Sequence, residues 1–345
     1  MKQRLPSILL LGEASTSEGP AVVTRLYIDG LKKVASEENR CAVWGGNSRH
    51  RMRLILGYAC LLFDRRSTVV LSGLGYSRGH LRLARFLKRN IIYIMHGYTG
   101  IEPGGPPFPK ESLAMGAATA IACVSNSFAV RMRRCFPEYA SKIHVLPNPV
   151  DFADIPVSGL SERDFRKIVL IGGGRPIKGN LAVCRAVELM NKSLAGGEKP
   201  FSVEVYGCSE TPVNNDETAE MSSLPCVKIH GTVPHPQILL ALSRAGLFVA
   251  NSDFETFGMA LTEALVCGAN VLTSPEIGAN DALGDALTPC DIISRPATPE
   301  SLARQMQYIL SAGNNARLSA ALRLPYNSAE KAAGRLFALA DSLTV

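Results

Sequence analysis

The stretch NSDFETFGMALTEALVCGANVL, residues 251–272, decides the fold class. It overlaps the end of one apolar run, GLFVANS (246–252), and the start of another, ANVLTS (269–274). Between them, Phe257 and Gly258 open an apolar-rich segment that stops at Gly268, a pattern typical of a helix. A buried strand, a helix and a second buried strand form a βαβ unit, so the sequence predicts a parallel sheet.

The same alternation extends over the whole chain. In the first half, apolar β-rich runs lie at 7–12, 41–46, 68–74, 91–97, 119–125 and 142–148. In the second half they lie at 167–173, 201–207, 227–231, 246–252, 269–274 and 291–294. Two sets of six predict an α/β protein with two doubly wound, Rossmann-like domains. The Pro-rich segment 146–161 separates them, which gives domains at 1–150 and 151–326. Ser328 can cap a last helix in 327–345, which we expect to cross back to the first domain.

Composition excludes several classes of protein. The chain has 345 residues, 46% of them hydrophobic, which is enough for packed cores and excludes a disordered chain. Its nine cysteines form no CxxC pair, so neither a zinc site nor a dense disulfide framework is indicated. No apolar run reaches the roughly 18 residues of a membrane-spanning helix. These features predict a globular protein of the cytoplasm.

Two carboxylates in the opening stretch are candidates for ligand binding. Gly258 lets a phosphate approach the backbone, and the N–H groups at a helix start attract anions. Glu255 and Glu263 are eight residues apart, which on a helix separates their Cα atoms by roughly 12 Å. That span suits the sugar and the ribose of a nucleotide sugar. The alternative is that Glu255 only complements the helix dipole and Glu263 is a solvated helix residue.

A second candidate is the loop IGGGRPIKGN, residues 171–180. It follows a predicted strand and precedes a predicted helix. Its three glycines allow a tight turn, and Arg175 and Lys178 offer two cations suited to a diphosphate. The loop matches neither the Walker A motif, GxxxxGK[ST], nor the dinucleotide-binding motif, GxGxxG. The alternative is a glycine turn with two surface cations.

Together these motifs resemble the retaining glycosyltransferases of family 4, which have the GT-B fold with two Rossmann-like domains facing across a cleft. The matching features are the E-x7-E pair, the GR-x2-KG loop, VLPNPVD (145–151), His96-Gly97, CVSNSFA (123–129) and residues 227–252. Three segments depart from the family pattern: Asn148-Pro149, EIGANDAL (276–283) and SEGP (17–20).

The resemblance implies a role for each matching residue. It implies that Glu255 binds the hydroxyls of the transferred sugar, Glu263 binds the ribose, and His96 lies near the reacting carbon. Arg175 and Lys178 would hold the diphosphate. Phe257, Gly258 and Met259 would offer backbone N–H groups to the sugar or the phosphate. Residues around His230 and Gly231 would border the base, and Gly19 would approach the phosphates from the first domain. Such enzymes need no metal, and the sequence has no D-x-D motif, so no metal or other cofactor is expected.

The implied activity is that of a retaining, metal-independent hexosyltransferase. The donor would be a nucleotide-sugar, most simply a UDP-sugar, and the acceptor a lipid-linked glycan of surface polysaccharide or glycolipid synthesis. Two alternatives stay open. One is a nucleotide-sugar 2-epimerase, and the other is a non-catalytic partner subunit that binds a nucleotide-sugar.

The charge distribution suggests a further partner. Residues 1–150 carry 21 Lys and Arg against 9 Asp and Glu, whereas residues 151–345 carry 16 against 21. The segment from Arg49 to Arg89 contains ten basic residues and a single acidic residue, Asp64, together with many apolar residues. This predicts peripheral binding to an anionic membrane, on the inner face of the cell membrane. The alternative is that the apolar residues pack on the sheet and the cations are solvated. Without an aromatic stacking platform, no nucleic-acid partner is expected.

Overall fold

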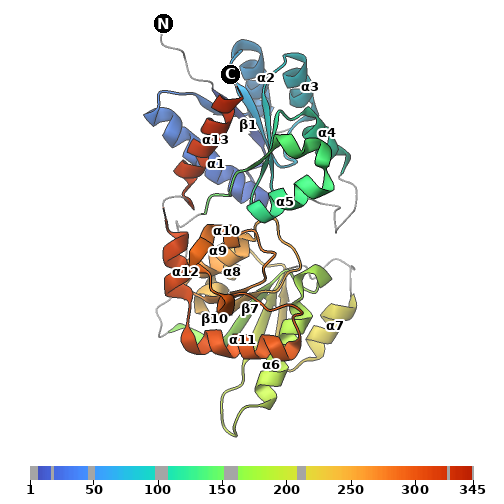
Figure 1. Ribbon diagram of the computed structural model, residues 1–345, viewed down its shortest axis with the longest axis vertical. Coiled ribbons are helices and arrows are strands. Elements are labelled where there is room, and N and C mark those ends of the chain that lie inside the picture. Colours follow the sequence, from blue (N-terminus) through green and yellow to red (C-terminus); the bar gives the residue numbers. More distant parts are fainter. Residues whose placement is uncertain are drawn as a thin grey trace. The chain divides into compact units, whose positions relative to one another are not determined.

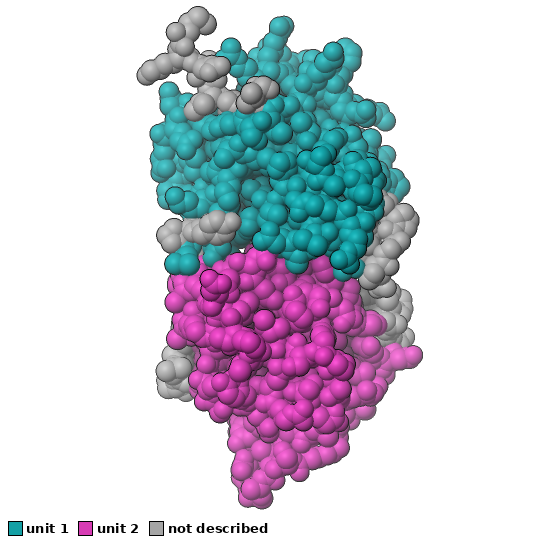
Figure 2. Space-filling model, in the orientation of Figure 1, with its two compact units in different colours: residues 1–151, 324–345 teal, residues 152–323 magenta. Residues whose placement is uncertain are grey.

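The computed structural model describes residues 7–16, 19–45, 51–97, 108–150, 162–207, 215–324 and 327–343 (Figure 1). The chain divides into two compact units (Figure 2). Unit 1 comprises residues 1–151 and 324–345, and unit 2 comprises residues 152–323.

Unit 1 is built on a six-stranded parallel sheet of order β2-β1-β3-β4-β5-β6. Its strands are β1 (Ile8–Gly12), β2 (Ala42–Trp44), β3 (Thr68–Ser72), β4 (Ile91–Met95), β5 (Ala120–Cys123) and β6 (Ile143–Val145). Its helices are α1 (Gly19–Glu37), α2 (Arg51–Phe63), α3 (Arg78–Phe86), α4 (Pro109–Ala117), α5 (Asn126–Cys135) and α13 (Ala329–Ser342). Every residue of β1, β3, β4 and β5 is buried, as expected for parallel strands covered on both faces.

The last helix belongs to unit 1 and lies along α1 (Figure 1). The side chain of Ser328 accepts a hydrogen bond from the Lys331 N–H, so the predicted helix cap is confirmed. The guanidinium of Arg40, just after α1, donates to Asp341 and lies 3.9 Å from the ring centre of Phe337. These contacts fix the end of the chain against the first helix.

Unit 2 is built on a five-stranded parallel sheet of order β11-β10-β7-β8-β9. Its strands are β7 (Asp164–Ile171), β8 (Ser202–Tyr206), β9 (Val227–Gly231), β10 (Ala245–Ala250) and β11 (Asn270–Thr273). Its helices are α6 (Asn180–Lys192), α7 (Asn215–Ser223), α8 (His235–Arg244), α9 (Met259–Val266), α10 (Asn280–Leu283), α11 (Pro299–Ala312) and α12 (Asn315–Leu322). The largest core of this unit packs α6 and α11 against the sheet.

The prediction of two Rossmann-like domains is confirmed, but the sixth strand predicted in the second half, 291–294, is wrong. Ile292 forms only an isolated bridge with Thr273. The neighbouring Ser294 N–H donates to the side chain of Gln305 instead of extending a ladder, and the turn Pro289–Asp291 is a short 3₁₀ helix. The Gln305 side chain, which also donates to the Ile292 carbonyl, therefore takes hydrogen bonds that a longer ladder would need.

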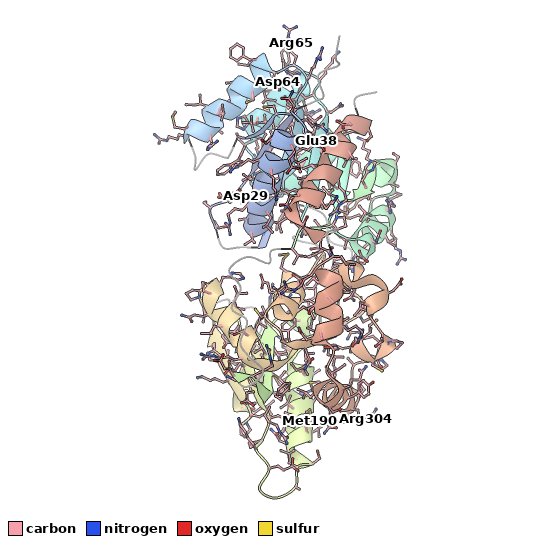
Figure 3. All side chains as sticks on the ribbon, turned by 90° about the vertical axis from the view of Figure 1, so that its left-hand side faces the viewer. Asp29, Glu38, Asp64, Arg65, Met190 and Arg304 are labelled. Atoms are coloured by element: carbon pink, nitrogen blue, oxygen red, sulfur yellow. The ribbon has the colours of Figure 1, made fainter. Side chains whose placement is uncertain are left out.

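The helices of the basic region bury different amounts of apolar surface. Helix α3 buries His80, Leu81 and Ala84, as a helix covering a sheet does. Helix α2 buries only Gly57 and Leu61 of its 13 residues. Asp64 and Arg65 follow α2 at one end of unit 1 (Figure 3). Much of the apolar surface of α2 therefore does not pack on the sheet.

Candidate functional site

The loop after β7 is shaped by glycines. The N–H groups of Gly172 and Gly173 both donate to the carbonyl of Tyr206 on β8. Gly172 has φ +110°, and a Cβ there would lie 2.8–3.0 Å from three carbons of the Lys178 side chain. Glycine therefore makes room for the Lys178 side chain to lie against the loop. The exposed Arg175 donates from Nε to the Gly172 carbonyl, 3.2 Å away, so both cations are arranged around Gly172.

This loop is joined to the loop after β10, which pairs with β7 in the sheet. The Asn251 side chain donates to the Gly179 carbonyl at 2.9 Å, and the Asp253 N–H donates to the Ile177 carbonyl at 2.8 Å. The chain order reverses between β7 and β10, and ligands of doubly wound sheets bind at such a switch point. The two candidate motifs of the sequence thus meet at the expected edge.

Glu255 lies in the loop after β10 and not on the following helix. Its N–H donates to the Glu276 carbonyl, and its carbonyl accepts from the Gly278 N–H, so Glu255 forms a parallel bridge with Ile277. Helix α9 begins only at Met259. The helical rise used to estimate the separation of Glu255 and Glu263 therefore does not apply, because only Glu263 is helical.

The carboxylate of Glu255 forms an ion pair with the ammonium group of Lys178. It also accepts a hydrogen bond from the Ser252 hydroxyl at 3.0 Å. The side chain of Lys178 is 15% exposed and that of Glu255 is 25% exposed. This pair is therefore partly shielded yet open to a ligand.

The start of α9 closes the same site. Gly258 has φ +95° and precedes the first helical residue, Met259. Phe257 is buried, and its carbonyl accepts from the Ala279 N–H at 2.6 Å, which anchors the helix start. A small cavity of about 70 Å³ is lined by Gly258 and Met259 together with Lys178 and Glu255. Because the first N–H groups of a helix have no intrahelical partner, this cavity suits an anion.

Glu263 lies one turn along α9, where its carboxylate is 3.0 Å from Nε2 of His235. His235 is the first residue of α8, and its role was not predicted from the sequence. Another residue that sequence reasoning missed is Arg295, which donates to the Asn251 side chain and to the Ser252 carbonyl, both at 3.1 Å. Arg295 lies outside the matching motifs, and His235 lies within the matching stretch 227–252 but was given no role there, so the contacts of both residues emerge only in the folded structure.

Gly231 ends β9, the edge strand of the sheet. It has φ +66°, and its carbonyl accepts from the Gly207 N–H at 2.6 Å. The preceding His230 stacks on the ring of Tyr206 with 4.5 Å between ring centres. The structure thus places a flat aromatic pair beside Gly231, at the edge where the base was expected.

Two predicted site residues belong to unit 1. His96 follows β4 and is buried, with Nε2 2.7 Å from the Ser72 hydroxyl, which lies 2.8 Å from the Thr24 hydroxyl. Burial lowers the pKa of His96 to about 4, although a hydrogen bond with Asn148 acts in the opposite direction. The imidazole is therefore neutral at physiological pH. Gly19 is the exposed first residue of α1, with open space where a Cβ would lie.

Comparison with known proteins finds a family match over the second unit. Residues 158–323 match the family model of the glycosyl transferases group 1. The group 1 match covers nearly all of unit 2 and includes both loops and α9. No curated protein matches the chain in sequence.

Solved structures extend the likeness to both units. Anabaena Alr3699/HepE in complex with UDP is 14% identical, covers 97% of this chain and 100% of its own, and has a TM-score of 0.66. A glycosyltransferase from Rickettsia africae is 15% identical, with 99% of both chains covered and a TM-score of 0.67. An E. coli structure described as trehalose-6-phosphate, bound with UDP-2-fluoro glucose, is 10% identical and has a TM-score of 0.68. The match covers 97% of this chain and 99% of the E. coli chain. These likenesses show the fold: the two units are Rossmann-like domains of the GT-B type.

Two features are absent from the part of the chain that the structure describes. Within the described ranges, no group of three or more His, Cys, Asp or Glu is placed to hold a metal ion. No helix among the same residues is both long and apolar enough to cross a membrane. Of the segments that depart from the family pattern, residues 17–18 lie outside the described residues, as does Arg49 of the basic region.

Proposed function

We propose that the protein is a retaining, metal-independent hexosyltransferase that uses a UDP-sugar as donor and a lipid-linked glycan as acceptor. The observation that carries this proposal is the Lys178–Glu255 pair beside the start of α9, at the switch point of the unit with the group 1 match. The solved HepE complexes contain UDP and UDP-glucose, which supports the choice of donor.

The chemistry assigned to the site follows from where charge develops. Breaking the bond between sugar and phosphate leaves negative charge on the diphosphate and oxocarbenium character on the sugar. Lys178, Arg175 and the N–H groups at Gly258 and Met259 would stabilise the leaving diphosphate, and fixed charges of this kind need no reorganisation during the reaction. Their positive charge would serve in place of a metal ion.

The two carboxylates would divide the donor between them. Glu255 would accept hydrogen bonds from the sugar hydroxyls, and Glu263, held by His235, would accept them from the ribose. Gly231 would border the base. Since Glu255 is assigned to binding, retention would follow from attack on the face that the phosphate leaves. Unit 1 would bind the acceptor, with neutral His96 near the reacting carbon and Gly19 near the phosphates.

A lipid-linked acceptor would bring unit 1 to an anionic membrane. On α2, Met52, Ile55 and Phe63 are 80%, 63% and 86% exposed, and on α3, Phe86 is also largely exposed. Exposed arginines surround these side chains, among them Arg51, Arg65 and Arg66. Apolar side chains among cations fit the surface of an anionic bilayer. On these grounds we place the protein at the inner face of the cell membrane.

Product analysis tests the proposed function. The protein is incubated with UDP-glucose or another UDP-sugar and a glycan acceptor in EDTA, and the products are followed by NMR. Free UDP with a glycoside of unchanged anomeric configuration is expected. A changed sugar on intact UDP would instead identify an epimerase, and binding without any product would identify a partner subunit. Lys178→Ala should lower kcat by roughly 100- to 1000-fold, whereas Lys192→Ala, an exposed lysine of α6, should not.

A further inference from the structure

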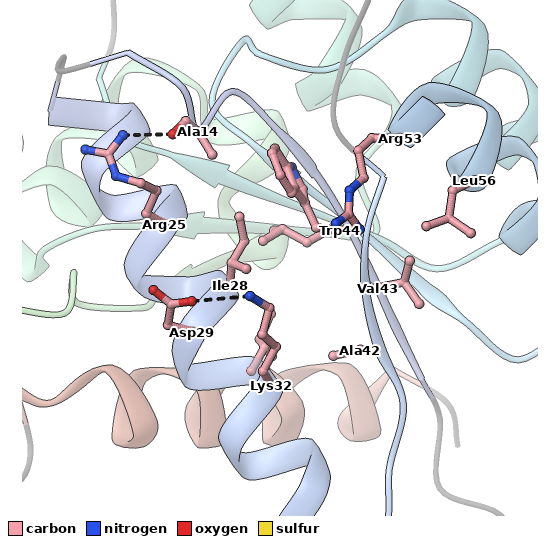
Figure 4. Close-up of a pocket in the computed structure, with 12 residues that line it drawn as sticks. Ala14, Arg25, Ile28, Asp29, Lys32, Ala42, Val43, Trp44, Arg53 and Leu56 are labelled. Carbon is pink, nitrogen blue, oxygen red and sulfur yellow. Dashed lines mark hydrogen bonds and ion pairs between the residues drawn. The ribbon is translucent and has the colours of Figure 1, made fainter. Parts of the chain in front are cut away.

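Unit 1 contains a second cavity, larger than the one at the start of α9 and of a different character. Its volume is about 470 Å³, within the range of small-molecule sites. Its lining residues come from β1 and the loop after it, and from α1, β2 and α2 (Figure 4). Most of the lining is aliphatic: Leu10, Ala14, Ile28, Leu31, Ala42, Val43 and Leu56. An aliphatic wall of this kind can hold an apolar chain, and the remaining lining residues are Trp44 and the charged Arg25, Asp29, Lys32 and Arg53.

The position of the cavity connects two parts of unit 1. At one end it reaches Ala14, in the loop between β1 and α1, where Arg25 donates to the carbonyls of Ala14 and Thr16 at 2.8 and 2.7 Å. At the other end it reaches Leu56, which is 39% exposed and lies on the helix that carries Met52 and Ile55. The cavity therefore runs from the carboxyl edge of the sheet to the exposed apolar surface of α2.

The polar groups of the cavity are mostly cationic. The Arg53 guanidinium lies 5.4 Å from the ring centre of Trp44, whose indole N–H donates to the Gly12 carbonyl at 3.3 Å (Figure 4). Among the described lining residues the one carboxylate is Asp29, which lies 3.4 Å from the ammonium group of Lys32. Because Lys32 pairs with Asp29 and Arg25 donates to the carbonyls of Ala14 and Thr16, we take Arg53 as the cation that meets an anionic ligand.

We propose that this cavity binds the apolar chain next to the phosphate of a lipid-phosphate-linked acceptor, with the phosphate near Arg53. The inference rests on the proposed function and names the part of the acceptor that unit 1 recognises. Three observations support this occupant: the aliphatic lining, the cation at the rim, and the continuity with the exposed face of α2. A free glycan fits less well, because seven of the twelve lining residues are aliphatic and offer sugar hydroxyls no hydrogen bond.

Trp44 provides a direct test, because it is the single tryptophan of the chain. The full-length protein is titrated with dodecyl phosphate below its critical micelle concentration, and the Trp44 emission is recorded. A saturable blue shift is expected, with none from inorganic phosphate. Leu56→Glu should weaken binding by at least about tenfold, because it places a carboxylate against the chain. The matched control Val130→Glu, at an exposed apolar residue of α5, should leave binding unchanged.

Further arms separate the alternatives. Arg53→Gln should weaken the binding of dodecyl phosphate by about tenfold and leave the binding of neutral dodecyl maltoside unchanged. An emission change caused only by an oligosaccharide, or only by phosphatidylglycerol vesicles, would overturn the assignment in favour of a glycan or a bilayer lipid. UDP binding, measured by thermal shift, tests the donor site separately. A UDP shift without a Trp44 response rejects this inference alone, and a Trp44 response without a UDP shift rejects the donor proposal alone.

Discussion

At the scale of single residues, the ion pair between Lys178 and Glu255 has a consequence for binding. The Lys178 ammonium has a carboxylate partner within the protein. A diphosphate that binds Lys178 must therefore compete with Glu255. In the complete donor the sugar hydroxyls would compensate Glu255, whereas free UDP offers no such compensation. On the proposed assignment, the pair would favour the intact donor over the product.

Glu255→Gln should separate these two effects. With the carboxylate removed and the shape kept, the affinity for UDP should stay the same or rise by a few fold, because Lys178 no longer has a competing partner. Turnover of the UDP-sugar should fall by about 100-fold, since the sugar loses a charged acceptor. Calorimetry with UDP and steady-state kinetics measure the two quantities. Glu263→Gln is the matched control and should weaken the binding of UDP itself, because the ribose loses its carboxylate. Equal losses of UDP affinity in both variants would contradict the assigned roles.

His96 predicts a pH dependence of stability. Its pKa is about 4 in the folded protein against about 6.5 when unfolded, so between these values the unfolded chain binds the extra proton. The contribution to stability is complete above pH 6.5 and is lost as the pH falls towards 4, by up to about 3 kcal/mol. Urea unfolding of the wild-type protein and of His96→Gln, at pH 7 and at pH 4.5, measures this loss of stability. The variant should lose less stability on acidification, and identical losses would show that His96 titrates normally.

At the scale of elements, the site depends on two glycine-shaped loops at neighbouring strand ends. Apolar runs and loop glycines are local signals, so the sequence predicted the parallel strands and the position of both loops. Contacts between distant segments are not local. The bridge that holds Glu255 against Ile277, the pairing of His235 with Glu263 and the hydrogen bonds of Arg295 depend on tertiary structure. The same reason explains why 291–294, strand-like in sequence, forms only one bridge.

Gly172→Ala should test the loop after β7. A methyl group there would contact the Lys178 side chain and would also strain a backbone with φ +110°. The strain should cost about 1–3 kcal/mol of stability, and the displaced Lys178 should lower kcat by at least about tenfold. Gly197→Ala is the matched control, because φ is +90° there but no atom lies within 4 Å of the added Cβ. It should lower the melting temperature and leave kcat unchanged, and a similar kcat in both variants would exclude a role for the loop in placing Lys178.

At the scale of the whole molecule, each unit provides a different function in the proposed reaction. Unit 2 carries the loops and the helix start that suit a phosphorylated donor. Unit 1 carries the aliphatic cavity and the apolar side chains of α2 among arginines. The sequence alone left open whether the apolar residues of the basic region pack on the sheet. The exposure of Met52, Ile55 and Phe63 favours the membrane alternative for α2, while α3 packs as an ordinary covering helix.

Membrane binding can be tested by reversing charges near α2 without touching the cavity. Wild type should co-sediment with phosphatidylglycerol vesicles in low salt and be released near 1 M salt, where the Debye length falls to about 3 Å. Replacing Arg51, Arg65 and Arg66 by Glu should weaken vesicle binding by about 100-fold or more, at about 1 kcal/mol for each basic residue lost at the surface. The control variant reverses Lys192, Lys199 and Arg304 of unit 2, which changes the net charge by the same amount and should leave vesicle binding intact. Equal losses of vesicle binding in both triple variants would mean that net charge, and not the α2 surface, controls binding. Both variants should still bind UDP.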